Sequence, residues 1–162
     1  MTDILQAWLY ATKDQGIIKN YDKVLDVGSL VVDYHYQGAR PVFYDAKEYI
    51  GIDIEEGLGV DRIVDMHELS KHFEPEYFDL VVCTEVFEHD PKFWVTLEEI
   101  KKVLKPGGYF LFSVPNAGEY HPYPKDYWRF MQDGITDVVL DGYKNRHVGQ
   151  VGSALAGWGV KK

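Results

Sequence analysis

The sequence predicts a doubly wound α/β fold, whose sheet is mostly parallel and ends in an antiparallel C-terminal hairpin. Short apolar runs alternate with mixed connecting segments, a pattern typical of successive βαβ units. The run at 78–84 is apolar on both faces, as expected of a central strand in a parallel sheet. The segment 143–160 holds two strand-like runs that meet near Gly152, which predicts the hairpin.

The composition indicates one globular domain without a nucleic-acid or membrane partner. Of the 162 residues, 46% are apolar and 27% are charged, which is enough for a single core. The net charge is −9 and no Lys/Arg cluster exceeds a pair, which disfavours binding to duplex nucleic acid. The sequence shows no signal peptide and no apolar run of about 20 residues, so we expect a cytoplasmic protein. Because the chain has one cysteine, Cys83, we expect neither a disulfide framework nor a zinc cluster within it, and no metal site is predicted.

The first elements follow from the spacing of apolar residues. Residues 3–14 show helical spacing and end before Gly16, a helix stop. Buried-strand patterns follow at 24–28, 49–54 and 62–65. The connections between these strands contain Gly and Pro, so we expect loops or short helices there.

The clearest predicted helix follows the strand at 78–84. Asp90 suits its N-cap and Pro91 its first helical position. Glu98 precedes Lys102 by four residues, the favourable order for an ion pair on a helix surface. A Lys-Pro-Gly-Gly turn then ends the helix.

Two elements complete the domain before the hairpin. The turn leads into a fifth strand at 109–114. A second helix at 132–140 is predicted to bury Ile135, Val138 and Val139.

The residues that end the first three strands predict a ligand site. In open α/β sheets, ligands bind beyond the carboxyl ends of the strands. Gly28 lets the backbone approach a ligand, and Asp53 is placed to accept both hydroxyl protons of a ribose. Asp65 is placed to accept from an adenine amino group, with Ile54 and Met66 as apolar walls. Together these residues predict an adenosine pocket.

The phosphate-binding loops of common nucleotide cofactors are missing. The sequence contains neither G-x-G-x-x-G nor G-x-x-x-x-G-K-[ST]. Bulky residues follow Gly28, where a pyrophosphate needs bare amides. Asp26 and Asp33 would repel a phosphate and favour the amino group and sulfonium of S-adenosylmethionine.

Five sequence segments follow one another in a characteristic order: VLDVGS (24–29), YIGIDIEEGLGVD (49–61), RIVDMHEL (62–69), FDLVVCTEVFEH (78–89) and EEIKKVLKPGGYFLFSVPN (98–116). Together they resemble the class I S-adenosylmethionine-dependent methyltransferases, especially the small type 11 kind, over about residues 24–130. The resemblance implies a Rossmann-like fold, S-adenosylmethionine as cofactor and S-adenosylhomocysteine as product. We expect one domain over 1–162, with an N-terminal helix (1–20), a cofactor-binding half (24–114) and a substrate side (115–162).

The resemblance assigns cofactor-binding roles residue by residue. Nine positions match: Asp26, Gly28 and Ser29 toward the methionine part, Asp53 and Ile54 toward ribose and adenine, Asp65 and Met66 toward adenine, and Thr84 and Glu85 toward the methyl end. The first motif departs from the family, because Leu30 and Val32 stand where later glycines are usual. Three groups are alternatives for holding the methionine carboxylate: the Ser29 amide, Tyr34 and Arg40.

The segments after the fourth and fifth strands carry the candidate catalytic and substrate residues. Glu88 and His89 close the fourth strand segment, where a histidine or carboxylate is suited to accept a proton from an acceptor hydroxyl. The ring-rich segment 121–130 resembles the YPxDYWRF stretch of type 11 relatives. We expect Trp128 and Phe130 to pack structurally and four residues to line the acceptor site: His121, Tyr123, Tyr127 and Arg129. Cys83 is expected to be a buried apolar residue without a catalytic role.

The predicted function is methyl transfer to an O or N atom of a small-molecule, sugar or peptide acceptor. A methyltransferase fold retained as a binding or assembly module is the alternative, since the first motif is irregular and the crossovers are short. A nicotinamide-dependent oxidoreductase is disfavoured, because the glycine fingerprint is missing and the sheet ends in an antiparallel hairpin.

Overall fold

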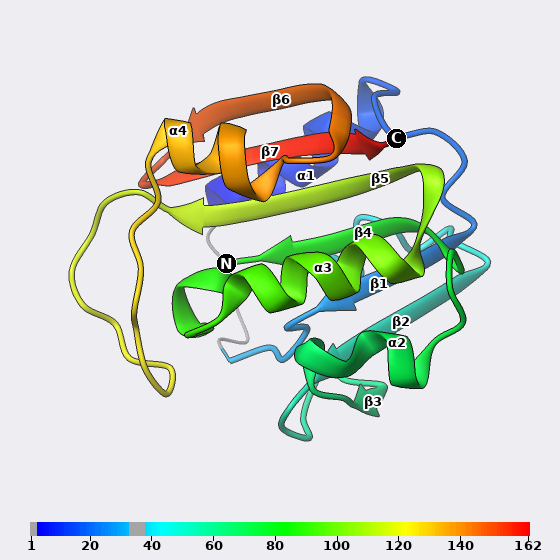
Figure 1. Ribbon diagram of the computed structural model, residues 1–162, viewed down its shortest axis with the longest axis horizontal. Coiled ribbons are helices and arrows are strands. Elements are labelled where there is room, and N and C mark those ends of the chain that lie inside the picture. The colour runs from blue at the N-terminus through cyan, green and yellow to red at the C-terminus, as the bar shows by residue number, and fades with distance from the viewer. Residues whose placement is uncertain (1–2, 33–37) are drawn as a thin grey trace.

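A computed structural model describes residues 3–32 and 38–162 and shows one seven-stranded sheet (Figure 1). The strand order is β3-β2-β1-β4-β5-β7-β6, in which the first five strands are parallel and the last two antiparallel. The predicted doubly wound sheet with its C-terminal hairpin is therefore confirmed. Asp33 and Tyr34, which the sequence raised as a phosphate-repelling acid and a carboxylate-binding alternative, lie outside the described residues.

The elements follow one another in the predicted order, with short turns between several of them. The helices are α1 Asp3–Asp14, α2 Leu69–His72, α3 Phe93–Val103 and α4 Gln132–Gly134. The strands are β1 Lys23–Val27, β2 Glu48–Asp53, β3 Arg62–Ile63, β4 Phe78–Thr84, β5 Leu104–Pro115, β6 Tyr143–Val151 and β7 Ala154–Lys161. The turns are η1 Met66–Glu68, η2 Phe87–His89 and the π-helical η3 Ile135–Val139.

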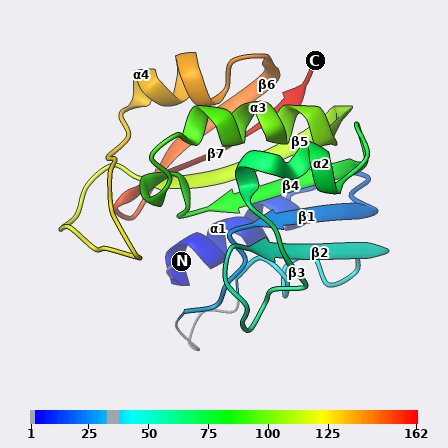
Figure 2. The same cartoon turned by 60° about the horizontal axis from the view of Figure 1, so that its bottom comes forward.

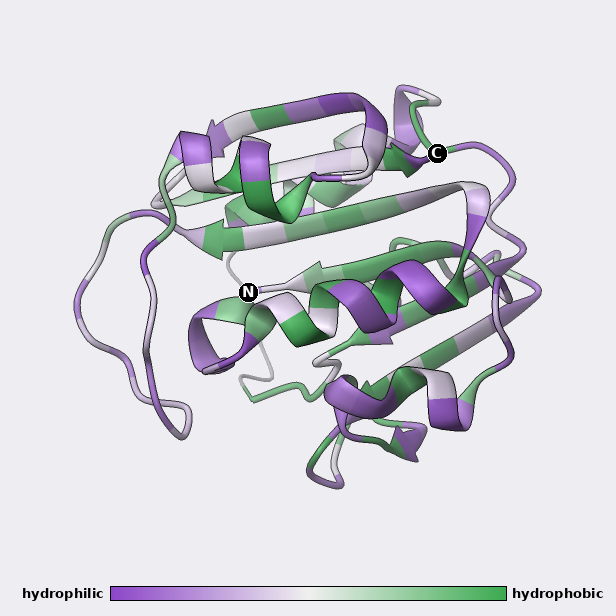
Figure 3. Ribbon diagram, viewed as in Figure 1, coloured by the Kyte–Doolittle hydropathy of each residue, from purple (hydrophilic) through white to green (hydrophobic). Residues whose placement is uncertain are grey.

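Helices cover both faces of the sheet. Helix α1 lies on one face, whereas α2, α3 and α4 lie on the other (Figures 1 and 2). Alternate side chains of β1 point to opposite faces, so Val24 packs with Leu9 of α1 and Leu25 packs with Ile100 of α3. Figure 3 shows apolar residues along β4 and most of β5, as expected for strands covered on both sides. Asp26, two residues after Val24, therefore faces the α1 side.

Helix α1 also contacts the end of the chain. Its Leu5 forms a small apolar cluster with Ala154 and Ala156 of β7. Small residues on β7 let the helix lie close to the strand, so the first and last elements of the chain pack against each other.

The beginning of α3 differs from the prediction. The helix starts at Phe93, so Pro91 lies before it and not at its first position. Asp90 nevertheless organises the start from outside, because its carboxylate accepts from the Lys92 amide at 2.8 Å and the Thr96 hydroxyl at 2.6 Å. The Asx turn that Asp90 forms delays the helix by two residues relative to the predicted cap.

The predicted ion pair on α3 is wrong in its register. Lys101 contacts Glu98 at 2.8 Å, and Lys102 contacts the largely buried Glu99. Both pairs are spaced i, i+3. Glu99 also accepts from the Ser70 amide, which fixes it on the side where Lys102 reaches it.

Three further segments differ in length or exposure. Strand β3 has only two residues. Strand β5 begins at Leu104, which pairs with Phe78 of β4, and after an irregularity at the Pro-Gly-Gly turn the pairing resumes at Tyr109. The predicted helix at 132–140 is one α-helical turn followed by the π turn η3, and Val138 is 46% exposed instead of buried. The described parts of the first two crossovers consist of turns and bends, as predicted.

Candidate functional site

The carboxyl ends of β1, β2 and β4 meet at one edge of the sheet, where Gly28 forms the first turn. Gly28 has a φ of +74°, and its amide donates to the Ile52 carbonyl at 2.9 Å. A Cβ atom at this position would lie 2.3 Å from Val86 Cγ2. Only glycine fits here, so the turn brings the backbone of β1 close to the segment after β4.

Asp53 organises the turn after β2. One carboxylate oxygen accepts from the Ile54 amide at 2.7 Å and the Glu55 amide at 3.2 Å, and the other from the Leu30 amide at 3.3 Å. A carboxylate has about four acceptor positions, so capacity for a ligand hydroxyl remains. Ile54 is 57% exposed, which leaves an apolar surface beside this carboxylate.

Asp65 lies at the edge strand, two residues after β3 ends. Its carboxylate accepts from the His67 amide at 2.8 Å and caps the η1 turn. The side chain is more than half exposed, and the next residue, Met66, packs partly against the core. Asp53 and Asp65 thus follow neighbouring paired strands, with their carboxylates at the same edge.

Thr84 and Glu85 end β4 in the centre of this edge. Thr84 is buried, and Glu85 adopts a left-handed backbone conformation with φ +56°. The Glu85 amide donates to the Ser113 carbonyl, and its carboxylate accepts from the Ser113 hydroxyl at 2.9 Å. Burial raises the pKa of the Glu85 carboxyl above its ordinary value.

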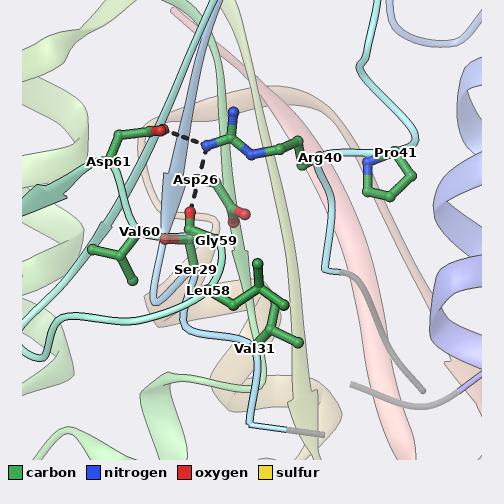
Figure 4. A pocket seen from close by; sticks show the side chains of 9 residues that line it. All are labelled: Asp26, Ser29, Val31, Arg40, Pro41, Leu58, Gly59, Val60 and Asp61. Carbon is green, nitrogen blue, oxygen red and sulfur yellow. Dashed lines mark hydrogen bonds and ion pairs between the residues drawn. The ribbon is translucent and has the colours of Figure 1, made fainter. Parts of the chain in front are cut away.

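A cavity of about 480 Å³ lies on the α1 face, beside β1 and β2 (Figure 4). The Asp26 carboxylate in its wall accepts from the Tyr49 hydroxyl at 2.6 Å. Burial raises the pKa of Asp26 to about 7, against the lowering effect of this hydrogen bond. The nine lining residues are Asp26, Ser29, Val31, Arg40, Pro41, Leu58, Gly59, Val60 and Asp61.

Arg40 connects the two loops that form the cavity mouth. Its guanidinium contacts Asp61 and the Gly59 carbonyl (Figure 4). The same guanidinium lies 4.4 Å from the centroid of the Tyr49 ring. The Asp61 carboxylate also accepts from the Gly51 amide at 2.7 Å. These contacts hold the loop before β3 over β2.

The cavity brings together only part of the predicted cofactor residues. Asp26, Ser29 and Arg40 line it, whereas the strand-end residues lie outside it: Asp53, Asp65, Thr84 and Glu85. The amide and hydroxyl of Ser29 both donate to the Ile52 carbonyl, at 3.0 and 3.3 Å. The Ser29 amide would have to give up its bond to β2 in order to hold a carboxylate, so this alternative stays a prediction.

A second cluster lies where β4 and β5 end. Glu88 is fully buried, and neither of its carboxylate oxygens has a hydrogen-bond partner among the residues that the structure describes. His89 Nε2 and His121 Nε2 approach the same Glu88 oxygen at 3.6 and 3.8 Å. Burial raises the pKa of Glu88 to about 8, and nearby Glu85 adds to the effect.

Backbone contacts hold the 116–131 loop against this cluster. The Tyr127 amide donates to the Glu88 carbonyl at 2.7 Å, and the Trp128 indole to the Asp90 carbonyl at 2.8 Å. Within the loop, Arg129 makes bonds of 2.6 and 2.7 Å to the two Asp126 oxygens. The loop thus has an internal ion pair and two fixed points on the segment after β4.

The candidate substrate residues have different surroundings. His121 faces Glu88, and Arg129 is committed to Asp126. Tyr123 and Tyr127 are 56% and 42% exposed, so their rings are accessible to a bound molecule. Phe130 is buried and Trp128 half-buried, and both pack on Phe93, as predicted. Cys83 is buried in the core, as expected of a residue without a catalytic role.

Sequence reasoning missed the structural role of Asp90. Besides starting α3, its carboxylate contacts His67 Nε2 at 2.9 Å, and its carbonyl accepts from Trp128. It thus connects the turn after β3, helix α3 and the 116–131 loop. Its position in an Asp-Pro pair directly after a strand segment was the available signal.

Comparison with known proteins places these features in context. The family described as a methyltransferase domain matches residues 5–141. A ubiquinone biosynthesis O-methyltransferase of Aliivibrio fischeri is 33% identical over 103 residues, which cover 58% of this chain and 44% of that protein. A demethylmenaquinone methyltransferase of Staphylococcus saprophyticus is 25% identical over 159 residues, which cover 78% and 68%. The chain thus spans less than half of the first relative's length.

Solved structures agree at the level of the fold. An S-adenosylmethionine-dependent methyltransferase from Archaeoglobus fulgidus superposes with a TM-score of 0.70 at 16% identity, covering 96% of this chain and 94% of that one. A Thermotoga maritima protein described as a possible histamine N-methyltransferase gives 0.73 at 16% identity, covering 98% and 89%. No helix among the described residues is long and apolar enough to cross a membrane.

Proposed function

Because this chain belongs to the class I S-adenosylmethionine-dependent methyltransferase family, we propose that it transfers a methyl group to an O or N atom of a small-molecule, sugar or peptide acceptor. The observation that carries the proposal is the placement of Asp53 and Asp65 after neighbouring parallel strands, beside the glycine turn that ends β1. This arrangement fits an adenosine without a phosphate cradle.

The residues at the edge fit the cofactor part by part. Asp53 would accept from the ribose hydroxyls and Asp65 from the adenine amino group, with the exposed Ile54 side chain against the ring. Thr84 and Glu85, in the centre of the edge, would lie toward the methionine and methyl end. Arg40 and the Ser29 amide are the alternatives among the described residues for holding the methionine carboxylate. In this structure Arg40 is paired with Asp61, and the Ser29 amide donates to the Ile52 carbonyl.

The chemistry requires alignment more than activation. When bound, S-adenosylmethionine supplies a methyl group already activated by its sulfonium. The chain holds the acceptor in line with that group and excludes water from the edge. For a hydroxyl acceptor, Glu88 and His89 are the groups proposed to accept its proton, since both lie in η2, the turn that follows the carboxyl end of β4. An amine acceptor needs only positioning.

Calorimetric titration with S-adenosylmethionine and S-adenosylhomocysteine tests the proposal. We expect micromolar binding by the wild type. Asp53→Ala removes two charge-assisted hydrogen bonds to the ribose, each worth about 1.5–3 kcal/mol, so affinity should fall on the order of 100-fold or more. Asp53→Asn keeps the shape of the turn and should weaken binding less. Asp137→Asn, on the exposed η3 turn, is the matched control and should bind as the wild type does.

Other outcomes would point to the alternatives. No binding of either compound would overturn the proposal. Binding without turnover across a broad acceptor panel would favour a binding or assembly module, and tighter binding of NAD would favour an oxidoreductase.

A further inference from the structure

We propose that Glu88, His89 and His121 form a binding site for a divalent transition metal of the Zn²⁺ type. Glu88 and His89 lie in η2 directly after β4, and His121 lies in the 116–131 loop after β5. Their ligand atoms all fall within 4.8 Å of one another. The residues come from separate segments that only the fold brings together, so their spacing in the sequence gave no metal motif.

The distances suit a small tetrahedral ion. Zn²⁺ binds His nitrogen and carboxylate oxygen at about 2.0–2.2 Å, which puts neighbouring ligand atoms roughly 3.3–3.5 Å apart. His89 Nε2 and His121 Nε2 lie 3.6 and 3.8 Å from the same Glu88 oxygen. The two histidine nitrogens lie within 4.8 Å of each other, so side-chain shifts of up to about an ångström would complete three bonds to one ion. Two imidazoles with one carboxylate is a donor set found in catalytic zinc sites.

Each imidazole is oriented by a contact at its other nitrogen. His89 Nδ1 lies 2.6 Å from the Lys125 carbonyl, so it donates there and Nε2 carries the lone pair toward Glu88. His121 Nδ1 lies 3.2 Å from the Glu119 carbonyl and 3.4 Å from the Asp126 carboxylate. Such outer partners fix the tautomer and direction of metal-binding histidines. Arg129 Nη2 lies 3.2 Å from His121 Nδ1 and competes for it, but Asp126 pairs with that guanidinium.

The Glu88 carboxylate supplies an independent indication of a ligand. It is fully buried, and both oxygens lack a hydrogen-bond partner among the described residues. Leaving a buried polar group unsatisfied costs about 1–3 kcal/mol, and more for a charged group. A bound cation would satisfy it. Glu85, the nearest other carboxylate to act on it, is already engaged by the Ser113 hydroxyl.

The fourth position of such an ion would remain open. His121 is half exposed, so this side of the cluster is reachable from solvent. The cluster borders Glu85 at the centre of the sheet edge, and an acceptor oxygen is the class of ligand that this position would take. This last role rests on the proposed methyl transfer, and it would replace proton acceptance by Glu88 and His89, whose lone pairs the metal would engage. Metal binding itself does not rest on methyl transfer.

Titration of the chelator-treated protein with Zn²⁺, and with Co²⁺ as a spectroscopic probe, tests the site. We expect one equivalent of metal to bind with micromolar or tighter affinity. Bound Co²⁺ should give the visible absorption spectrum of a four-coordinate ion, and Zn²⁺ should raise the Tm. Glu88→Gln and His121→Ala should each weaken binding at least tenfold. His147→Ala, on the exposed face of β6, should not.

The outcomes separate the metal site from the methyltransferase proposal. Absence of stoichiometric binding, or binding unchanged by both ligand variants, would overturn the site. His121 lies on an exposed loop, so its variant should keep the fold even if a change at buried Glu88 does not. Repeating the S-adenosylhomocysteine titration without metal tests the proposed function alone, because the cofactor residues are distinct from the three metal ligands.

Discussion

The two halves of the sheet edge, where the strands end, place carboxylates in opposite surroundings: exposed on one side and buried on the other. At β2 and β3, Asp53 and Asp65 are in turns open to solvent, and each holds backbone amides of its own turn. At β4 and β5, Glu88 is fully buried and its carboxylate has no hydrogen-bond partner among the residues described. The first pair is satisfied without a ligand, whereas the second cluster is completed by a ligand or by a proton.

This difference explains what each half contributes. Exposed carboxylates that are fixed by their own turns are preorganised acceptors for neutral hydroxyl and amino groups. A buried carboxylate between two imidazoles is suited to a cation or a proton. The Asp26 cavity on the α1 face resembles the second case, because its carboxylate is buried too, but a tyrosine hydroxyl partners it.

Asp26→Asn should give the largest effect, and it tests burial on the cofactor side. Burial raises the pKa of Asp26 from its ordinary 3.8 to about 7, so the folded chain keeps a proton that the unfolded chain has lost in this window. Wild-type stability therefore falls as pH rises from about 4 to 7, whereas asparagine does not titrate. Between about pH 4 and pH 7, the free energy of unfolding of the variant, taken relative to that of the wild type, should grow by on the order of 4 kcal/mol. Urea unfolding of both proteins at pH 4 and pH 8 measures this difference. The same difference at both pH values would show that the pKa of Asp26 is not raised by folding.

Gly51→Ala tests how tightly the loop before β3 is fixed. A Cβ at this position would lie 2.2 Å from the Gly59 carbonyl oxygen and 2.7 Å from Ser29 Oγ. We expect a loss of about 1–3 kcal/mol in the free energy of unfolding, because backbone must move. Gly134→Ala, which has open space, is the control for urea unfolding. Equal free energies of unfolding for the two variants would mean that the loop before β3 can move away from residue 51 at little cost.

Trp128→Phe tests the attachment of the 116–131 loop. It removes the indole bond to the Asp90 carbonyl and keeps most of the ring contact with Phe93. Loss of this one partly buried hydrogen bond should cost about 1 kcal/mol. Limited proteolysis of the loop should quicken and Zn²⁺ binding should weaken a few-fold, since His121 is on the same loop. Trp94→Phe, at a 49% exposed position, is the control, and identical cleavage rates for both would contradict the attachment.

Arg40→Ala should have the smallest effect on stability. Its ion pair with Asp61 is about two-fifths exposed at both side chains, and exposed pairs contribute about 1 kcal/mol or less. Thermal unfolding at low and high salt should show a small loss that salt reduces further. A loss above about 2 kcal/mol would show that stacking on Tyr49, and not the charge pair, holds the loop.

The fold was predictable where a local pattern decides structure. Strand β4 is apolar on both faces and lies next to β1 near the sheet centre, and the chain reverses near Gly152 as predicted. Boundaries set by tertiary contacts were not predictable. Helix α3 starts at Phe93 because Asp90 forms an Asx turn with Lys92 first.

The same distinction applies to the site. Asp53 and Asp65 could be selected because parallel strands place their ends at one edge, although their role toward a cofactor stays a prediction. The contact between Glu88 and His121 depends on how the 116–131 loop folds back onto η2. The spacing of residues in the sequence does not predict how this loop folds. The engagement of the Ser29 amide by Ile52 also depends on how two strand ends approach each other.

The packing of α1 on β7 has a consequence for how the chain matures on the ribosome. Ala154 and Ala156, which pack against Leu5, are translated about 150 residues after it. With synthesis at about 5–20 residues per second, the first helix waits several seconds for its partner strand. During that interval the Leu5 side chain is open to chaperones, and truncation of the chain before β7 would leave it without Ala154 and Ala156.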